Sequence, residues 1–578
     1  MAALKGLKPE KVFEYFEKLC SVPHGSGNTK IISDLCVGFA KELGLRYRQE
    51  ACNNLIIWKD GSVGYEQSEP IILQGHIDMV CAKTDECAKD MAAEGLDLRT
   101  DGEWVWADQT SLGGDNGIAV AMILAILADD TLPHPPLEAV FTVDEEVGMD
   151  GAFALDCSDL KGKKLLNLDS EEEGIFTVSC AGGMRADCTL PGKREPLGGE
   201  SCYAVTLSGL QGGHSGGDID KGRGSANALM GRVLYSAMEQ LSGLRLAAIQ
   251  GGRFDNVICS RCDAVIAVPA GKEADLDQFI RGFDATLKNE YAGCDGGVTL
   301  ECAKTEAASA VSAETTSVML HTLFALPQGV EAMSADFPGL RLAAIQGGRF
   351  DNVICSRCDA VIAVPAGKEA DLEQFIRGFD ATLKNEYAGC DAGVTLECAK
   401  TESSPAVSAE TTSVMLHTLL ALPQGVEEMS ADFPGLVQTS LNLGVMHLTE
   451  DGLHFSYSIR SCIASQKAML AQRVHAIVEF AGGTVSERGN YPGWQYERDS
   501  KLRELVLDVY RDLTGTEGKL EATHGGLECG LFIEKIPGLD AISLGPELHD
   551  VHSVRERLSV PSTERVYELV CEVLRRSR

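Results

Sequence analysis

The spacing of apolar residues predicts alternating helices and strands over the first 180 residues. Residues 9–20 and 27–43 repeat apolar positions at helical spacing, and Pro9 suits an early helix position. The runs PIILQGHIDMV, LEAVFTVDEEVG and KKLLNLDSEEEG are typical of buried strands that end in polar residues. GGDNGIAVAMILAILADD predicts a buried helix that opens on a Gly-rich turn. Together they predict an α/β fold with a mostly parallel sheet and helices on both faces.

The pattern changes after about residue 185 and changes back near residue 495. Shorter alternating stretches such as CYAVTLSGL and LHFSYSIRS indicate a separate α+β domain there. The C-terminal segment returns to a helix–strand–helix pattern, which can complete the first sheet. We therefore predict the first part of one domain at 1–184, an inserted α+β domain at 185–495, and the second part of the first domain at 496–578.

A tandem repeat occupies the middle of this inserted region. Residues 244–339 and 340–435 differ at only seven positions. Solenoid repeats keep a sparse pattern and let other positions drift, so near-identity indicates a recent duplication or an error in assembling the gene. A doubled binding surface is the alternative interpretation.

Charge and composition exclude some classes of partner. The 578 residues contain 51 Lys and Arg against 85 Asp and Glu, a formal net charge of −34, which disfavours nucleic acid and anionic membranes. The N-terminus has no apolar signal-peptide region, and the longest strongly apolar run, 117–128, is too short to span a bilayer. The 20 cysteines are therefore interpreted as reduced thiols, and the expected location is the cytoplasm.

Acidic and histidine residues cluster where the predicted strands end. Sites in such sheets lie at the carboxyl ends of strands. The candidates are His76, Asp78, Asp115, Glu145, Glu146, Asp169, and one of His549 and His552. Taken singly, each has an ordinary explanation: a satisfied polar pair for His76 and Asp78, a solvated glutamate pair, a helix cap for Asp115 and a turn residue for Asp169. Their joint appearance at three successive strand ends favours a metal site.

The residue types fit a pair of divalent cations. Mixed His and carboxylate ligands suit Zn²⁺, with Mn²⁺ or Co²⁺ possible. A carboxylate such as Asp115 can bridge two metals. Residues two apart in a strand share a face, so Asp78 can lie behind His76 and accept the other ring N–H of that histidine. Of two adjacent glutamates, one can bind metal while the other takes a proton from water and passes it to a leaving amine.

These motifs resemble a known family. GHIDMV, GGDNGIA, VDEEVGMDGA, LLNLDSEEEG, GGHSGGDI, HGGLECGLF and HSVRER, in this order, are similar to the aminoacyl-histidine (Xaa-His) dipeptidases, relatives of the carnosinases within the dinuclear-zinc exopeptidases. The resemblance covers the whole chain once one repeat copy is set aside. It implies hydrolysis of dipeptides and two divalent metals, most often zinc. It also implies that 1–184 and 496–578 form the catalytic, metal-binding domain, and that 185–495 is an inserted lid or dimerisation domain through which a homodimer is possible.

The resemblance also implies roles for individual residues. The implied metal ligands, with Asp115 bridging, are His76, Asp115, Glu146, Asp169 and His552. Glu145 is implied as the general base, Asp78 as the residue that orients His76, and the peptide bond after Asp115 as cis. His549 is expected to neighbour the site without binding metal.

Substrate contacts are implied mainly in the lid. His214 is implied to hold the oxyanion and Arg460 to bind the substrate carboxylate, where a bidentate guanidinium is suitable. The Asn of FDNVI occurs twice, as Asn256 and Asn352, because the repeat copies it. Glu528, outside the lid, corresponds to a position near the substrate amine. The extra repeat copy departs from the family pattern and lies between His214 and Arg460. Because every candidate metal ligand lies outside it, we expect the metal site to form regardless of how the lid folds.

Rival interpretations remain at this point. The chain could be a related amidohydrolase, such as an N-acyl amino acid deacylase or a carboxypeptidase, or a homologue whose catalysis is impaired by the duplication. The pair Cys259 and Cys262, repeated at 355 and 358, could suggest structural zinc. Because the second pair was copied with its segment, it adds no independent support. The interpretation favoured by the sequence is a metallodipeptidase that acts on small peptides.

Overall fold

The protein is described by a computed structural model that divides into two compact units, one formed by Met1–Cys180 with Pro492–Arg578 and the other by Ala181–Tyr491. We call them unit 1 and unit 2. The domain boundaries expected from sequence were 184/185 and 495/496. The structure describes residues 3–578 with these exceptions: 192–193, 199, 216–217, 222, 253–256, 292–294, 296, 306–308, 450–451, and 312–421 apart from 337–347, 358–365, 380, 384, 395 and 406–407.

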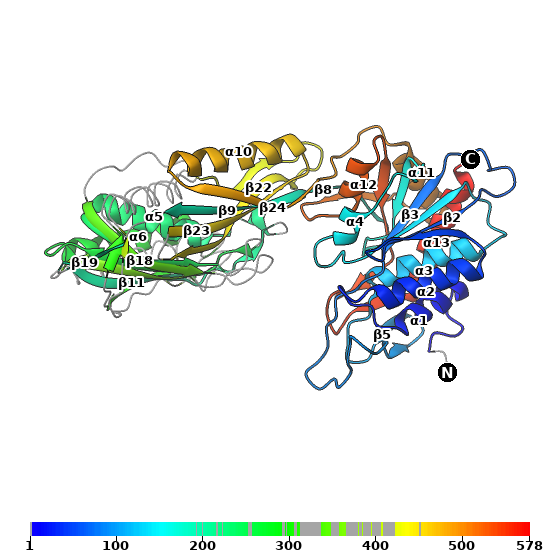
Figure 1. Ribbon diagram of the computed structural model, residues 1–578, viewed down its shortest axis with the longest axis horizontal. Helices are drawn as coiled ribbons and strands as arrows, with labels where there is room; N and C mark the ends of the chain where they lie inside the picture. Colours follow the sequence, from blue (N-terminus) through cyan, green and yellow to red (C-terminus); the bar gives the residue numbers. More distant parts are fainter. Residues whose placement is uncertain are drawn as a thin grey trace. The chain divides into compact units, whose positions relative to one another are not determined.

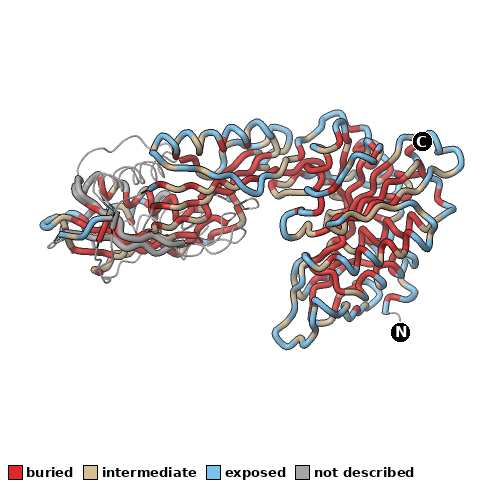
Figure 2. The backbone as a smooth tube through the Cα atoms, viewed as in Figure 1, coloured by how far each residue is buried: buried red, intermediate tan, exposed pale blue. Residues whose placement is uncertain are grey.

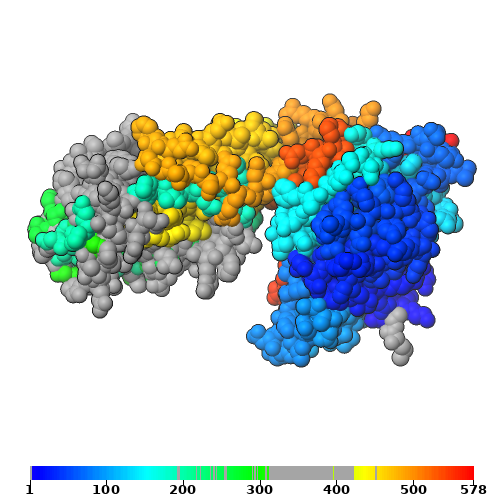
Figure 3. Space-filling view, in the orientation of Figure 1, coloured from blue at the N-terminus to red at the C-terminus, as the bar shows by residue number. Residues whose placement is uncertain are grey.

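Unit 1 is built on an eight-stranded mixed sheet. Its order is β1 (Arg46–Gln49), β2 (Leu55–Lys59), β6 (Leu137–Thr142), β3 (Ile71–His76), β7 (Lys164–Asn167), β26 (Asp540–Ser543), β8 (Ile175–Cys180), β25 (Lys519–Thr523). The centre, from β6 to β26, is parallel as expected. The expectation of a mostly parallel sheet is too simple, because β1–β2, β2–β6 and β8–β26 pair antiparallel. Chain segments from both ends therefore complete one sheet, and Figure 3 shows the blue-to-cyan and orange-to-red parts sharing its surface.

Helices bury the sheet of unit 1. In Figure 1, α1 (Glu10–Cys20), α2 (Lys30–Glu42) and α3 (Gly114–Ala128) lie together along one side of the sheet. Helix α3 is apolar all round and almost wholly buried, as a helix between other layers must be. Pro9 is the N-cap of α1, consistent with its expected position at a helix start. The remaining helices of the unit are α4 (Asp150–Ala154), α11 (Lys501–Thr514), α12 (Cys529–Lys535) and α13 (Val560–Arg576).

A small sheet stands beside the large one in unit 1. It consists of β27 (Leu548–His549), β28 (Arg557–Ser559), β5 (Trp104–Ala107) and β4 (Leu98–Thr100), all antiparallel. The turn between β27 and β28 contains His552, so this hairpin holds the last candidate ligand of the chain.

Unit 2 is an α+β unit with an eleven-stranded sheet. Its outer strands are β16 (Thr299–Thr305) and β11 (Glu200–Ser208) at one end, and β22 (Val437–Leu448), β23 (Gly452–Ser461), β9 (Gly182–Pro191) and β24 (Thr484–Tyr491) at the other. Helices α5 (Ala226–Gln240), α6 (Glu273–Glu290) and α10 (Ala464–Phe480) pack on it. Figure 2 shows buried residues running along these strands, and they form one apolar core.

The two repeat copies approach the same partner strands. From the first copy, β13 (Leu241–Gly251) pairs Gln250 with His447 of β22. From the second, β18 (Phe337–Gly347) pairs Gln346 with the same His447, which also pairs with His454 of β23. Gln250 and Gln346 are corresponding residues of the two copies, so each copy offers β22 the same pairing register. Most other residues of the second copy lie outside the described part of the chain.

The sequence-based expectations for cysteines and for membrane-spanning segments can be compared with the described residues. Cys20, Cys36 and Cys529 carry free thiols. Cys262, within the first repeat copy, is disulfide-bonded, so the expectation of reduced thiols fails at that position. Cys259, the other cysteine of the CxxC motif, contacts the Asn227 side chain. None of the helices among the described residues is both long and apolar enough to cross a membrane.

Candidate metal centre

The parallel strands bring the candidate residues to one edge of the sheet. Strand β3 lies between β6 and β7, with His76 opposite Thr142 and Gln74 opposite Asn167. Because the strands run in one direction, the residues that follow them emerge at the same edge. Glu145 and Glu146 follow β6, and Asp169 follows β7.

Asp115 enters this edge from the start of α3. The residue lies in the first turn of the helix, its backbone is not helical, and the Asp115–Asn116 peptide bond is cis, as the family resemblance implies. The Asn116 side chain accepts from the backbone N–H of His76 at 3.2 Å and donates to the carbonyl of Leu168 at 2.9 Å. Asn116 therefore fixes the helix start to the two strands that carry His76 and Asp169.

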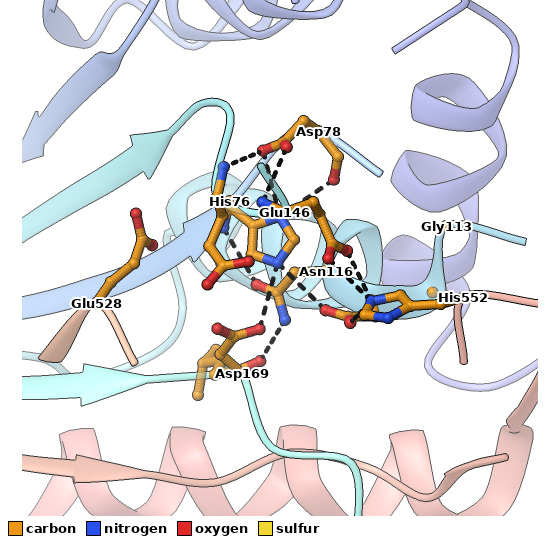
Figure 4. Close-up of polar contacts among 12 residues, drawn as sticks. His76, Asp78, Gly113, Asn116, Glu146, Asp169, Glu528 and His552 are labelled. Atoms are coloured by element: carbon orange, nitrogen blue, oxygen red, sulfur yellow. Dashed lines mark hydrogen bonds and ion pairs between the residues drawn. The ribbon is translucent and has the colours of Figure 1, made fainter. Parts of the chain in front are cut away.

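The two carboxylate oxygens of Asp115 face two different histidines. Its Oδ1 lies 3.2 Å from Nε2 of His76, and its Oδ2 lies 3.1 Å from Nε2 of His552. Nε2 of His76 is also 3.4 Å from Oδ1 of Asp169, and Nε2 of His552 is 2.9 Å from Oε2 of Glu146. Figure 4 shows His76, Glu146, Asp169 and His552 converging. Ligand atoms of His76, Asp115 and Glu146 all lie within 4.8 Å of one another, which makes a candidate metal site.

Asp78 supports the far side of the His76 ring. Nδ1 of His76 lies 3.1 Å from the Asp78 carbonyl and 3.4 Å from its Oδ1. The predicted reason for this contact was wrong, because β3 ends at His76 and Asp78 belongs to the loop beyond it rather than to the same strand face. The Asp78 carboxylate also accepts from the backbone N–H groups of Glu145 (3.1 Å) and Glu146 (3.4 Å) and from Ser26 Oγ (2.9 Å). One carboxylate thus orients both the histidine and the glutamate pair.

Crowding of carboxylates perturbs their protonation. Burial raises the pKa of Asp169 to about 6, with further contributions from the charges of Asp115 and Glu146. Burial also raises the pKa of Glu145 well above its ordinary value, and nearby Asp169, Glu528 and Glu146 act in the same direction. A set of like charges held this close is stabilised by a bound cation or proton.

The pKa values of two histidines are raised as well, by their carboxylate neighbours and against the effect of burial. Burial alone would lower the pKa of His76, but the charge of Asp169 and hydrogen bonds to Asp115, Asp169 and Asp78 raise it well above its usual value. Hydrogen bonds to Asp115 and Glu146 raise the pKa of His552 to about 11. Each imidazole contacts two carboxylates through its Nε2 atom. A metal ion bound between the same atoms would replace these contacts.

Glu528 lies beside this cluster among buried polar side chains. It is wholly buried, and its Oε2 accepts hydrogen bonds from Gln74 Nε2 at 2.6 Å and Thr142 Oγ1 at 2.7 Å. Its Oε1 is buried without a hydrogen-bond partner among the described residues. Burial raises the pKa of Glu528 to about 7. In the view of Figure 4 it lies on the other side of His76 from His552.

The remaining predicted residues lie elsewhere in unit 1, in unit 2, or outside the described residues. The His549 ring lies against Trp104, with ring centroids 4.9 Å apart, and its Nε2 lies 2.7 Å from Glu547 Oε1. His214, in the short strand β12 (Gly213–His214), and Arg460, in β23, belong to unit 2. Burial and the Arg460 charge lower the pKa of His214 to about 4. Asn256 and Asn352 lie outside the described residues.

Sequence reasoning missed several residues around the cluster. Glu556, four residues after His552, accepts hydrogen bonds from the backbone of the Asp115 loop. Asn116 and Ser26 fix His76 and Asp78, and Gln74 and Thr142 hold Glu528. A signal existed for Glu556 in the motif HSVRER, where an acidic residue interrupts a basic stretch. The strand residues Gln74 and Thr142 gave a weaker signal, as polar positions inside otherwise apolar runs.

Known proteins resemble this chain over its full length. The cytosol non-specific dipeptidase of Escherichia coli K12 is 32% identical over 577 residues, which covers all of this chain and 99% of that protein. The crystal structure of aminoacylhistidine dipeptidase from Vibrio alginolyticus matches with a TM-score of 0.75 and 30% identity, covering 99% of this chain and 97% of that one. Residues 205–294, within unit 2, match the M20 peptidase dimerisation domain.

Proposed function

Because this chain belongs to the cytosol non-specific (aminoacyl-histidine) dipeptidases of the M20 metallopeptidase family, we propose that it hydrolyses dipeptides at a centre of two divalent cations. One observation carries the proposal. The two oxygens of the Asp115 carboxylate face two histidines from distant parts of the chain, His76 at 3.2 Å and His552 at 3.1 Å. A carboxylate in that position can be shared by two metal ions.

The side chains fit two cations of the zinc type. His76 and Asp169 would hold one ion and Glu146 and His552 the other, with Asp115 between them. Mixed imidazole and carboxylate donors suit Zn²⁺ and also accept Co²⁺ or Mn²⁺. Divalent cations held there would supply Lewis acidity, which polarises a peptide carbonyl and makes a water molecule more acidic.

Glu145 is proposed as the general base. Its backbone N–H is fixed by Asp78, while its raised pKa suits a group that accepts a proton and returns it. In this proposal the Glu145 carboxylate takes a proton from water and delivers it to the nitrogen of the leaving amino acid. Asp78 keeps the His76 ring in one orientation by accepting its Nδ1–H, since the carbonyl and carboxylate of Asp78 both lie within 3.4 Å of that atom.

Glu528 is proposed to bind the free ammonium group of the substrate. Its Oε1 is buried and has no partner among the described residues, although its Oε2 accepts two hydrogen bonds. A cationic donor would satisfy this oxygen and stabilise the ionised carboxylate. A site of this kind favours peptides with an unblocked amino end over N-acyl amino acids.

The substrate contacts from unit 2 rest on the family resemblance together with local chemistry. His214, with a pKa lowered to about 4, is neutral at neutral pH and can donate one ring N–H to an oxyanion. Arg460 is proposed to bind the substrate carboxylate, and Asn256 or Asn352 to contact the substrate from the lid. The repeated segment 244–339 and 340–435 is proposed to belong to this lid, with no metal ligand inside it.

Turnover assays test the proposal against its rivals. The purified full chain, loaded with Zn²⁺ or Co²⁺, is offered beta-alanyl-histidine, other dipeptides, N-acetyl amino acids and longer peptides with a free carboxyl end. The proposal expects hydrolysis of dipeptides and its loss on chelation. Preference for N-acyl amino acids would identify a deacylase, preference for longer peptides a carboxypeptidase, and no turnover with metal bound a catalytically impaired homologue.

Two further expectations follow from the family. The match of residues 205–294 to a dimerisation domain supports a homodimer formed through unit 2, which sedimentation of the full chain measures. The E. coli relative is named a cytosol enzyme, which supports the cytoplasm as the location of this chain.

A further inference from the structure

Glu556 is a buried carboxylate that neither the proposed metal set nor the proposed mechanism uses. It is 3% exposed and lies four residues after His552, directly before β28. The intervening residues form a turn in which the Glu556 N–H donates to the Ser553 carbonyl at 3.2 Å. This turn directs the glutamate inward, away from the exposed tip of the hairpin.

The Glu556 carboxylate accepts hydrogen bonds from four successive backbone N–H groups. Oε2 accepts from Leu112 (2.8 Å) and Gly113 (3.2 Å), and Oε1 accepts from Gly114 (2.8 Å) and Asp115 (3.4 Å). These groups include the first N–H groups of α3, which have no partner within the helix and carry its positive dipole end. A carboxylate is well suited to occupy that place.

The glycines of the motif GGDNG allow the backbone to wrap around this carboxylate. Gly113 has φ of +65°, in the left-handed region that favours glycine. A Cβ on Gly114 would lie 2.7 Å from Leu548 Cδ2 and 3.3 Å from Glu556 Oε1. The last of the four N–H groups belongs to Asp115 itself, so the carboxylate of Glu556 fixes the backbone from which the shared ligand projects.

We propose that Glu556 is a positioning residue for the metal centre, which holds the Asp115 loop and the His552 loop in one fixed relation. The inference rests on the proposed function, because it assumes that Asp115 and His552 bind metal. Glu556 touches neither substrate nor reacting atoms. It acts through Asp115, whose Oδ2 lies 3.1 Å from the His552 ring.

The chemistry of glutamine makes the proposal testable. A carboxamide has one acceptor oxygen, and its NH₂ group would face two backbone N–H donors, so Glu556→Gln loses part of the four-bond set without a change in size. Glu556→Asp keeps the charge and shortens the side chain by one methylene. Partners that orient metal ligands typically change metal affinity by about 10- to 100-fold when mutated.

Glu138 offers a matched control in the same unit. It lies near the start of β6, at the opposite end of the strand from the site, and is 4% exposed. Its carboxylate also accepts from backbone N–H groups, those of Lys161 (3.0 Å) and Gly162 (2.9 Å). Glu138→Gln therefore breaks the same kind of contact away from the metal centre.

The experiment titrates Co²⁺ into metal-free, full-length wild type, Glu556→Gln, Glu556→Asp and Glu138→Gln. It records binding by calorimetry, the Co²⁺ absorption spectrum, urea unfolding, kcat and KM. We expect Glu556→Gln to weaken at least one Co²⁺ site by about 10-fold or more, with a changed spectrum and a kcat that falls more than KM changes. Glu138→Gln should lose stability while its Co²⁺ affinity stays within about twofold of wild type, because no metal ligand depends on it.

Wild-type Co²⁺ affinity and spectrum in Glu556→Gln would overturn the inference, whatever its loss of stability. If Glu556→Gln does not fold, the same two readouts are applied to Glu556→Asp: wild-type Co²⁺ affinity and spectrum in that variant would overturn the inference. A wild-type chain that binds no Co²⁺ would instead refute the proposed function, so the two failures are distinguishable.

Discussion

Replacing Glu528 with glutamine is expected to stabilise the metal-free protein at alkaline pH while it impairs the enzyme. The carboxyl is wholly buried, and only its Oε2 is engaged, by Gln74 and Thr142. A glutamine has nearly the same shape, and its amide oxygen can accept both of those hydrogen bonds. It differs from glutamate mainly in that it never ionises.

The pKa gives the direction and the size of the effect. The pKa of Glu528 is about 7 in the folded protein against 4.5 as the ordinary value. Because the folded-state pKa is the higher one, the contribution of this carboxyl to stability is complete below pH 4.5 and is lost as pH rises through 7. The full loss corresponds to about 3 kcal/mol. Glu528→Gln has no proton to lose, so relative to wild type it should gain up to about that amount.

Urea unfolding of the metal-free proteins at about pH 5 and about pH 8 measures this difference. Subtracting wild type from variant at each pH removes groups common to both. The exposed Glu521 of β25, changed to glutamine, is the control and should show no comparable dependence on pH. Equal stability differences at the two pH values, or a variant that becomes relatively less stable at the higher one, would refute the reasoning.

The same variant tests the role of Glu528 in catalysis. Loss of a charged hydrogen bond to the substrate ammonium costs about 1.5–3 kcal/mol. We therefore expect kcat/KM for dipeptides to fall by about 10- to 150-fold. An unchanged kcat/KM would show that Glu528 does not bind the substrate.

Three further changes give separate predictions. Glu145→Gln should lower kcat by about 100- to 10,000-fold while Co²⁺ binding stays at two ions, because the residue is a base and not a ligand; loss of a metal ion with it would contradict that role. His549→Ala should leave metal content and turnover near wild type, since its ring contacts Glu547 and Trp104 rather than the cluster, and a lost ion in the purified variant would revise the ligand set. Deleting residues 244–339 or, separately, 340–435 should give folded dipeptidases with similar turnover, because both copies offer β22 the same register; an active product from only one deletion would show that the copies are not equivalent.

Much of the fold and of the site was predictable because local patterns dominate there. The apolar runs before His76, Glu145 and Asp169 specified three strands, and parallel strands place their following residues at one edge. The start of α3 was predictable from its glycines, which is why Asp115 was expected at a helix start. Each of these predictions depends on the sequence pattern within one segment or on the pairing of adjacent strands.

What escaped prediction depends on contacts between distant segments. Glu556 meets residues that precede it by more than 400 positions, and no periodicity in either segment encodes that meeting. Asp78 was expected beside His76 for the wrong reason, since strand alternation does not apply where the strand has ended. The antiparallel edge of β1 and β2 follows from their short connection, which the apolar pattern alone does not reveal.

Anomalous scattering from crystals of the zinc-loaded protein with a dipeptide analogue would test the central claim most directly. The account predicts two metal peaks, one in contact with His76 and Asp169 and the other with Glu146 and His552, both within bonding distance of the Asp115 carboxylate. A single peak, or two peaks of which Asp115 touches only one, would contradict it.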